Sequence, residues 1–521
     1  MSGHNSQFSA DISASQLDEI ELASRIPLPT SRTPSTFFIS ADPQTPLDPD
    51  PSNFVSSSLR GSVNESNLPP VDRGNGAWSF LAAAFIVEAV VWGFPNSYGV
   101  FLDAYLQDPR FTSQKNAPSL LPLIGTLSSG IIYCSGSVIN PISARYPEHR
   151  RKSMWLGAIL CCGTLLGASY ATEIFQLILS QGILYAIGGS LLYLPCVSFM
   201  SEWFIARRGM ANGILFAGNA AGGLLLPLVL PPLISKYGSS KTLRILAIAI
   251  AIFLFPLLPF IKGRLPQTRA RIHGPTPRGA AETSRLDERQ VILDLPRRQH
   301  PARLWILRPH PVSTQYSSIV SITALEITHC SSIAFANDLH VGSSKSAVTL
   351  AMLNAASVVG RLSMGFLSDK LNPWILALSS LFTTSVATFI LWGVLSHSFS
   401  GLLAFGIAYG SIAGSWSSLW TGFVRPLAKD DPGISTTLFG YLLLLRGIGN
   451  IMSTPISAKL YSRPHNITGS AESTGFDVGN GRFETMIIYV GTCFAGAAGI
   501  AALGLTMDIR RGLRSSNQNS G

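Results

Sequence analysis

The stretch GMANGILFAGNAAGGLLLPLVLPPLI, residues 209–234, contains no charged side chain. A helix rises 1.5 Å per residue, so about 20 such residues cross the roughly 30 Å hydrocarbon core of a bilayer. The stretch therefore predicts a membrane-spanning helix. Two glycine pairs spaced four residues apart, Gly209 with Gly213 and Gly218 with Gly222, predict close approach to neighbouring helices.

Further stretches along the chain have the same character. Hydrophobic residues make up 47% of the chain and charged residues only 13%, whereas a soluble protein carries about 25% charge. The predicted spans run near 77–102, 118–140, 153–172, 174–201, 209–234 and 242–262, and then near 314–337, 346–367, 374–394, 400–423, 434–460 and 484–507. The sequence thus predicts an all-α membrane protein with about twelve transmembrane helices in two six-helix halves.

Five segments follow from this pattern: a tail at 1–76, six-helix halves at 77–262 and 314–507, a basic loop at 263–313, and a tail at 508–521. The first tail is rich in Ser, Pro, Asn and Asp and has no sustained apolar period, so we expect it to be disordered. No basic region leads into an early apolar run, so no cleaved signal peptide is expected.

The distribution of charge predicts the orientation. The net charge is +10, and the basic residues lie between spans, on one side if the spans alternate. This side collects the 263–313 loop and further clusters: Arg145, Arg150, Arg151, Lys152, Arg207, Arg208, Arg425, Lys429, Arg510, Arg511 and Arg514. The positive-inside rule then puts both termini in the cytoplasm. The same placement argues for a lipid bilayer as partner and against nucleic acid.

The opposite side holds a glycosylation sequon at Asn466, which we expect to be outside, whereas the sequon at Asn64 lies in the cytoplasmic tail. The plasma membrane is the expected location, with the vacuolar membrane as alternative.

Signals for catalysis, metals and cofactors are lacking in the sequence. The six cysteines fall within apolar segments and are interpreted as packing residues, and no ATP-binding loop, dinucleotide fingerprint or nucleophile–base pair is visible. We therefore expect no enzyme activity, no cofactor and no metal. No obligate protein partner is evident.

Three motifs carry a family resemblance. The first span begins Asp72-Arg-Gly-Asn-Gly-Ala-Trp78, the fifth begins Trp203-Phe-Ile-Ala-Arg-Arg-Gly-Met-Ala-Asn-Gly213, and the eighth contains Gly360-Arg-Leu-Ser-Met-Gly365. These strings resemble the major facilitator superfamily and, within it, the fungal branch of the monocarboxylate porter family. The resemblance covers roughly residues 72–508.

The resemblance implies roles for several residues. Gly365 to Lys370 resembles the short cytoplasmic loop in which an acidic residue is a gating contact, here Asp369 with Lys370. The first-half counterpart, 140–145, lacks the Gly and the Asp. Arg361 matches the arginine that binds the substrate carboxylate in the family.

Two residues depart from the family pattern, and both argue against a proton symport mechanism of the lactate type. Asn96 and Ser357 stand where the proton-linked carboxylate carriers of that family have lysine and aspartate.

Ionisable residues inside spans are costly and need a reason to be there. Glu88, Glu326, Arg361 and Arg446 sum to zero charge and can pair within a bundle. Glu88 is either a contact for substrate or proton or the structural partner of an arginine, and Arg446 is interpreted as a structural ion-pair residue.

Two local patterns add candidates. Glu88, Trp92 and Asn96 share one helical face beside Pro95, which we expect to bend the helix. Trp92 alone fits packing better than stacking on a substrate. Glu326 and His329, three residues apart, can share a proton, unless His329 faces a loop.

The function expected is a gradient-driven secondary transporter that moves an organic anion or exports a secondary metabolite by alternating access, with or without a proton. Uptake of a monocarboxylate or vitamin-like nutrient is the alternative. A non-transporting membrane sensor with a carrier fold is the alternative from another class.

Overall fold

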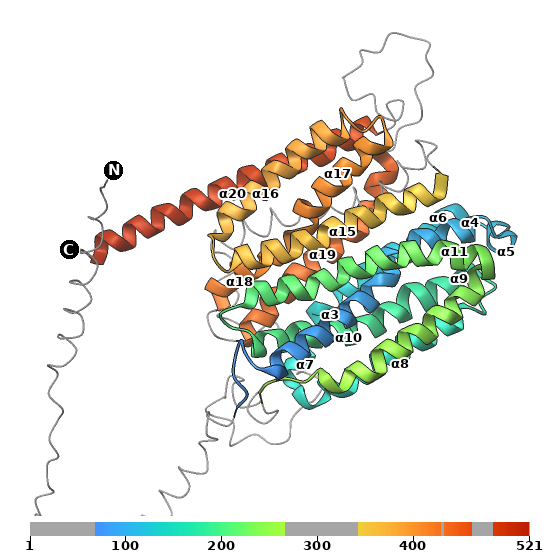
Figure 1. Cartoon of the computed structure of the whole chain (residues 1–521), viewed down its shortest axis with the longest axis horizontal. Helices are drawn as coiled ribbons and strands as arrows, with labels where there is room; N and C mark the ends of the chain where they lie inside the picture. Colours follow the sequence, from blue (N-terminus) through green and yellow to red (C-terminus); the bar gives the residue numbers. More distant parts are fainter. Residues whose placement is uncertain (1–67, 266–341, 429–431, 461–482, 520–521) are drawn as a thin grey trace, which may run out of the picture. The chain divides into compact units, whose positions relative to one another are not determined.

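The computed structural model describes residues 68–265, 342–428, 432–460 and 483–519. These residues form helices and short connections, with no strand among them, and the long helices run side by side (Figure 1). The predicted span at 314–337 and nearly all of the 263–313 loop lie outside the described residues.

A first set of helices covers residues 75–260. It comprises α3 (Asn75–Asn96), α4 (Tyr98–Leu106), α5 (Pro109–Thr112), α6 (Ala117–Cys134), α7 (Gly136–Arg145), the 3₁₀ helix η2 (Pro147–His149), α8 (Arg150–Ala168), α9 (Ile174–Leu177), the π-helix η3 (Ile178–Leu184), α10 (Tyr185–Trp203), α11 (Arg208–Leu257) and the 3₁₀ helix η4 (Leu258–Phe260).

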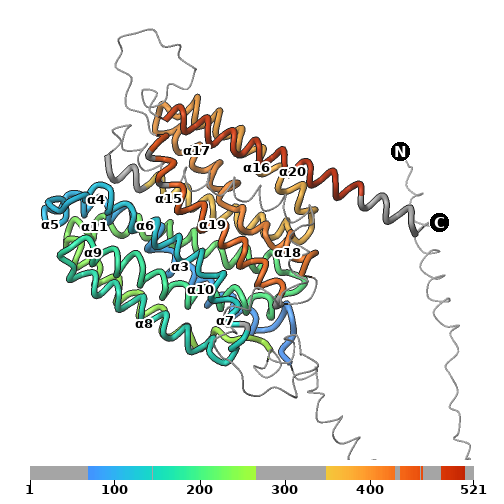
Figure 2. Tube along the Cα trace, turned by 180° about the vertical axis from the view of Figure 1, so that it is seen from behind, coloured from blue at the N-terminus to red at the C-terminus, as the bar shows by residue number. Residues whose placement is uncertain are grey.

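A second set covers residues 342–519. It comprises α15 (Gly342–Ser368), α16 (Pro373–Ala387), the π-helix η5 (Thr388–Trp392), α17 (Phe399–Ile412), the 3₁₀ helix η6 (Ala413–Leu419), α18 (Trp420–Ala428), α19 (Pro432–Leu460) and α20 (Glu484–Asn519). Figure 2 shows the first set, blue to green, on one side and the second set, yellow to red, on the other.

Nine helical segments of the described chain are long and apolar enough to cross a membrane. They match the predicted spans with two differences. The predicted span at 153–172 corresponds to α8, which is not among the nine and begins earlier, at the charged residues Arg150 and Arg151. The spans predicted at 209–234 and 242–262 follow one another within α11, where Gly238 makes a kink at φ 78°. A side chain there would be strained, so glycine permits the kink.

Pro95 precedes a break in the first span, as the sequence predicts. α3 ends at Asn96, Ser97 leaves helical geometry at φ −105° and ψ 5°, and α4 starts at Tyr98. The Ser97 amide still donates to the Gly93 carbonyl, at 3.1 Å, so the hydrogen bonding of the last turn of α3 reaches across the break.

The glycine pairs of α11 lie against two different neighbours, as predicted. A Cβ added at Gly213 would lie 2.6 Å from the Arg361 carbonyl oxygen of α15, and one at Gly222 would collide with the Ala89 carbonyl oxygen of α3. Small residues thus bring the backbones of α11, α15 and α3 together. The contact of α11 with α15 joins the two sets of helices (Figures 1 and 2).

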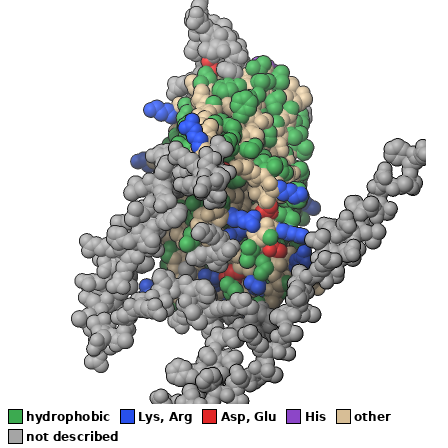
Figure 3. Space-filling view, turned by 90° about the vertical axis from the view of Figure 1, so that its left-hand side faces the viewer, with side chains coloured by type: hydrophobic (Ala, Val, Ile, Leu, Met, Phe, Trp, Pro, Cys, Tyr) green, Lys and Arg blue, Asp and Glu red, His purple; other side chains and the backbone are tan. Residues whose placement is uncertain are grey.

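Large apolar side chains are exposed around the bundle, among them Phe175, Ile252 and Val359, each more than 60% exposed. Such a surface suits lipid rather than water. Figure 3 shows charged side chains gathered in the lower part of one face, below a surface dominated by hydrophobic ones.

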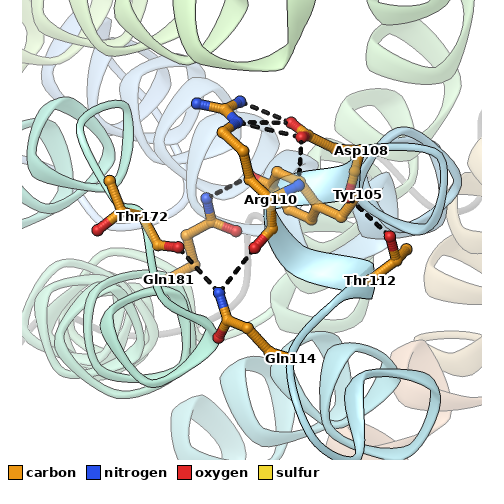
Figure 4. Close-up of polar contacts among 7 residues, drawn as sticks. All are labelled: Tyr105, Asp108, Arg110, Thr112, Gln114, Thr172 and Gln181. Carbon is orange, nitrogen blue, oxygen red and sulfur yellow. Dashed lines mark hydrogen bonds and ion pairs between the residues drawn. The ribbon is translucent and has the colours of Figure 1, made fainter.

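A polar cluster closes one end of the first set (Figure 4). Gln114 donates to the carbonyls of Arg110 and Thr172 at 2.8 Å and 2.9 Å, and so joins the α5 region to the connection after α8. Asp108 caps α5 and pairs with Arg110 at 2.6 Å. The Arg110 guanidinium hydrogen-bonded to Asp108 holds the pKa of that carboxyl below its ordinary value.

Candidate functional site

Three ionisable side chains are buried where the two sets of helices meet. Glu88 of α3 is 0% exposed, Arg361 of α15 is 6% exposed and Arg446 of α19 is 8% exposed. Arg361 and Arg446 are the cations that act electrostatically on Glu88. Neither carboxylate oxygen of Glu88 accepts a hydrogen bond from a described residue. Arg361 and Arg446 thus place two guanidinium groups at this meeting point, and a guanidinium is well suited to a planar anion.

Arg361 connects the two sets directly. Its Nε donates to the Gly414 carbonyl in η6 at 2.9 Å, and its Nη1 donates to the Phe216 carbonyl in α11. In the 3₁₀ segment η6, backbone carbonyls are less regularly engaged than in an α-helix. The arginine therefore holds one backbone carbonyl from each set.

Aromatic rings surround the charged group. The Trp92 ring lies 4.3 Å from the Tyr133 ring and 5.7 Å, edge-on, from the Tyr193 ring, measured between centroids. The Arg446 guanidinium lies over Tyr133, 4.7 Å from its centroid, at the distance of a cation–π contact. Trp92 also has an indole N–H without an acceptor among the described residues. This region can therefore offer flat surfaces and a donor to a bound molecule.

Asn96 lies two turns along α3 from Glu88 and binds another helix. Its Nδ2 donates to the Asn219 side-chain oxygen at 3.0 Å and to the Asn219 carbonyl at 3.3 Å. The predicted polar face of Glu88, Trp92 and Asn96 thus exists, but Asn96 contacts α11 rather than the charged group.

The predicted gating loop contacts the start of α11. Asp369 accepts hydrogen bonds from the Gly209 and Met210 amides, both at 2.8 Å. Lys370 is exposed and lies 4.1 Å from the centroid of the Phe366 ring. Glu326, His329 and Asn466 lie outside the described residues.

The sequence reasoning missed several residues of this region. Tyr133, Tyr193 and Asn219 carry no local pattern that indicates their partners, because each partner lies on a different helix. Arg150 was interpreted only as a loop charge, yet it forms an ion pair with Glu202 at 3.2 Å. A glutamate at a span end, facing a basic cluster, is the signal from which that pair could have been found.

Buried charges at the meeting point of two helix sets, in a bundle with an apolar surface, define a membrane transport protein. The family model described as the Major Facilitator Superfamily matches residues 80–428. This match spans more than half of the chain, and the chain belongs to the Major Facilitator Superfamily.

Curated relatives come from fungi. The MFS-type transporter pynF of Aspergillus niger is 24% identical over 76% of this chain and 84% of its own length. The Fujikurins efflux protein of Gibberella fujikuroi is 25% identical over 82% and 85%, and the Aspyridones efflux protein apdF of Emericella nidulans is 24% identical over 78% of each.

Among solved structures, the Major Facilitator Superfamily transporter FucP matches with a TM-score of 0.53. The match covers 82% of this chain and 99% of FucP at 14% identity, which supports the same fold. The chain is thus a multi-pass membrane transporter of this superfamily.

Proposed function

We propose that this transporter exports a small to medium organic anion, of the secondary-metabolite type, across the plasma membrane. The observation that carries the proposal is the position of Arg361, a buried guanidinium beside Glu88 and Arg446 that donates to a backbone carbonyl of each set of helices. A guanidinium shielded from water binds a planar anion through parallel charge-assisted hydrogen bonds, so an anionic solute suits this position. The names of the relatives from Gibberella fujikuroi and Emericella nidulans support the direction, since both are called efflux proteins.

The mechanism proposed is alternating access between halves at 77–262 and 314–507, with both termini in the cytoplasm. Arg361 binds the solute anion with its planar guanidinium, and Trp92 provides a flat contact and an N–H donor. Glu88 competes with the solute for the arginines. Asp369 and Lys370 act at the gate, and Asn96 positions α11 against α3.

The remaining assignments rest on the sequence. We place the chain in the monocarboxylate porter branch on its three motifs, without the lactate-type proton symport that Asn96 and Ser357 disfavour. Glu326 and His329 are proposed as coupling residues, and Asn466 as a glycosylation site on the outer side.

Flux into proteoliposomes tests the proposal. The purified protein is reconstituted, and uptake is measured for the organic acids that accumulate inside cells lacking the gene but not in their medium. Saturable flux of such an acid is expected. Binding of the acid without flux would instead support a membrane sensor, and failure of the deletion strain to grow on one nutrient would support uptake.

A further inference from the structure

The turn that leads into α11 is held by the carboxylate of one residue, Asp72. That carboxylate accepts hydrogen bonds from three consecutive backbone amides, those of Ile205, Ala206 and Arg207, at 3.2 Å, 2.9 Å and 2.9 Å. The amide of Asp72 itself donates to the Trp203 carbonyl at 3.0 Å. Asp72 adopts a left-handed backbone at φ 58°, which aspartate tolerates better than most residues. Asp72 therefore binds the turn through both its carboxylate and its backbone amide.

Two amides slightly further along the chain donate to a second carboxylate. Gly209 and Met210 donate to Asp369, as described above. The N-cap residue of α11, Arg207, makes no side-chain cap of its own. The first amides of a helix lack partners within the helix and attract anions. The start of α11 is thus shared by Asp72 and Asp369, through charge-assisted hydrogen bonds.

The carboxylates of Asp72 and Asp369 come from different sets of helices. Asp72 lies just ahead of α3, and α3 packs on α11 so closely that a Cβ at Gly218 would collide with the Phe85 carbonyl oxygen. Asp72 and the turn therefore move together. Asp369 follows α15, in the second set, so its contact must break whenever the two sets separate at this end.

We propose that Asp72 is a positioning residue of the transport cycle. It fixes the turn at 204–207 so that the Gly209 and Met210 amides stay directed at Asp369 each time the two sets meet. The inference rests on the alternating-access transport proposed above. Without the Asp72 carboxylate, three amides lose their acceptor and the turn relaxes, so the contact with Asp369 forms less often.

Neighbouring contacts keep the surrounding helices in place when Asp72 is changed. Glu202 pairs with Arg150, and the Trp203 indole N–H donates to the Lys262 carbonyl at 2.8 Å. These contacts hold the end of α10 but supply no acceptor for the amides of the turn. A change at Asp72 should therefore affect the turn and leave the bundle folded.

The test compares D72N, D369N and the double variant, reconstituted in lipid nanodiscs. Spin labels replace Tyr146 and Arg425, which are exposed at this end in the first and second sets, and pulsed dipolar spectroscopy measures their separation. Each single variant is expected to raise the ratio of separated to closed molecules about tenfold, because hydrogen bonds to a charged group are lost. In the double variant this ratio should be close to that of either single variant, because both residues act through the same contact.

A matched control is D108N, since Asp108 also caps a helix of the first set, α5, by accepting from the Arg110 amide at 3.0 Å. D108N should leave the label separation unchanged. The proposal is overturned if D72N lowers thermal stability without changing the separation, or if its effect adds fully to that of D369N. Failure of flux in the wild-type protein, with the label results as expected, would count against the transport proposal alone.

Discussion

Arg361 donates to backbone carbonyls of Phe216 and Gly414, which belong to opposite sets of helices. The same guanidinium is the residue that the family resemblance assigns to the substrate anion. Holding the two carbonyls and binding the anion both use the planar donors of the guanidinium. The two roles are compatible with each other if the solute replaces one of the carbonyls. The two roles make different predictions for conservative variants.

Replacement of Arg361 by alanine should abolish flux while the amount of protein at the cell surface stays normal. Arg361→Lys keeps the positive charge but loses the planar fork, so we expect flux reduced by about tenfold or more. Surface labelling and proteoliposome flux measure the two quantities. Wild-type kinetics in the alanine variant would remove Arg361 from the site.

Replacement of Glu88 by glutamine removes the negative charge but keeps the shape. Because the neutral glutamine no longer competes with the solute for the arginines, the KM for an anionic solute should fall and the pH dependence of flux should flatten. Flux measured against solute concentration at several pH values checks this. Glu148→Gln, at an exposed glutamate, is the matched control. If E88Q behaves like the control, Glu88 has no part in solute binding.

For single residues, the sequence predicts candidates best where burying a charged side chain costs much free energy. Glu88, Arg361 and Arg446 could be singled out because a charge inside an apolar span needs a partner. The partners themselves could not be found from sequence. The contact of Arg446 with Tyr133 joins α19 to α6, and no local spacing encodes a contact between distant helices.

Among the elements, α11 has the most demanding packing. Its glycines at 213 and 218 face α15 and α3 respectively, and each leaves no room for a side chain. The spacing of four residues is enough to predict such contacts, because it places small residues on one face.

Replacement of Gly213 by leucine should separate α11 from α15, since even a Cβ there would lie 2.6 Å from the Arg361 carbonyl oxygen. Overpacking of this kind costs about 1–3 kcal/mol. A lower melting temperature in detergent is expected, measured by fluorescence-detected size exclusion. Gly163→Leu is the control, because a Cβ at Gly163 has no neighbour within 4 Å. Equal melting temperatures in the two variants would contradict the packing described.

The irregular helices could not be predicted from sequence. The π-helices η3 and η5 continue the apolar runs of the adjoining α-helices, and the serine-rich 3₁₀ helix η6 contains no proline that would mark its change of geometry. A change from α to 3₁₀ or π geometry alters the hydrogen-bond partner by one residue, which hydrophobic patterning does not register.

For the whole molecule, two of the polar contacts between the helix sets, those of Asp369 and Asn140, are unequal. Asp369 accepts two hydrogen bonds of 2.8 Å, whereas the counterpart on the other side, Asn140, donates one of 3.4 Å to the Thr436 carbonyl. A charged acceptor with two short bonds is stronger than a neutral donor with one long bond. The contact of α15 with α11 should therefore release last.

Asp369→Asn should accordingly open this end far more than Asn140→Ala. Cys134 of α6 reports the opening, because it lies against α19, where a Cβ at Gly447 would collide with its sulfur. We expect maleimide labelling of Cys134 to rise about tenfold in D369N and less than about twofold in N140A. Equal rates in the two variants would show that the contacts are equivalent. The other native cysteines are replaced by serine in this assay.

The two sets of helices and most of their spans were predictable, since bilayer-length apolar runs leave few alternatives. Which side of the membrane each helix end faces remains the prediction of the positive-inside rule. The kink at Gly238 was not predicted, because seven polar and small residues, SKYGSSK at 235–241, read as an ordinary loop.

That kink bears on how the protein is made. About thirty residues separate the start of α11 from Gly238, so the two helical arms of α11 meet at a tip roughly 45 Å from that start. Lys236 and Lys241 sit at the tip. With both termini in the cytoplasm, as proposed above, the two arms carry these two ammonium groups through to the outer leaflet as they enter the bilayer during biosynthesis.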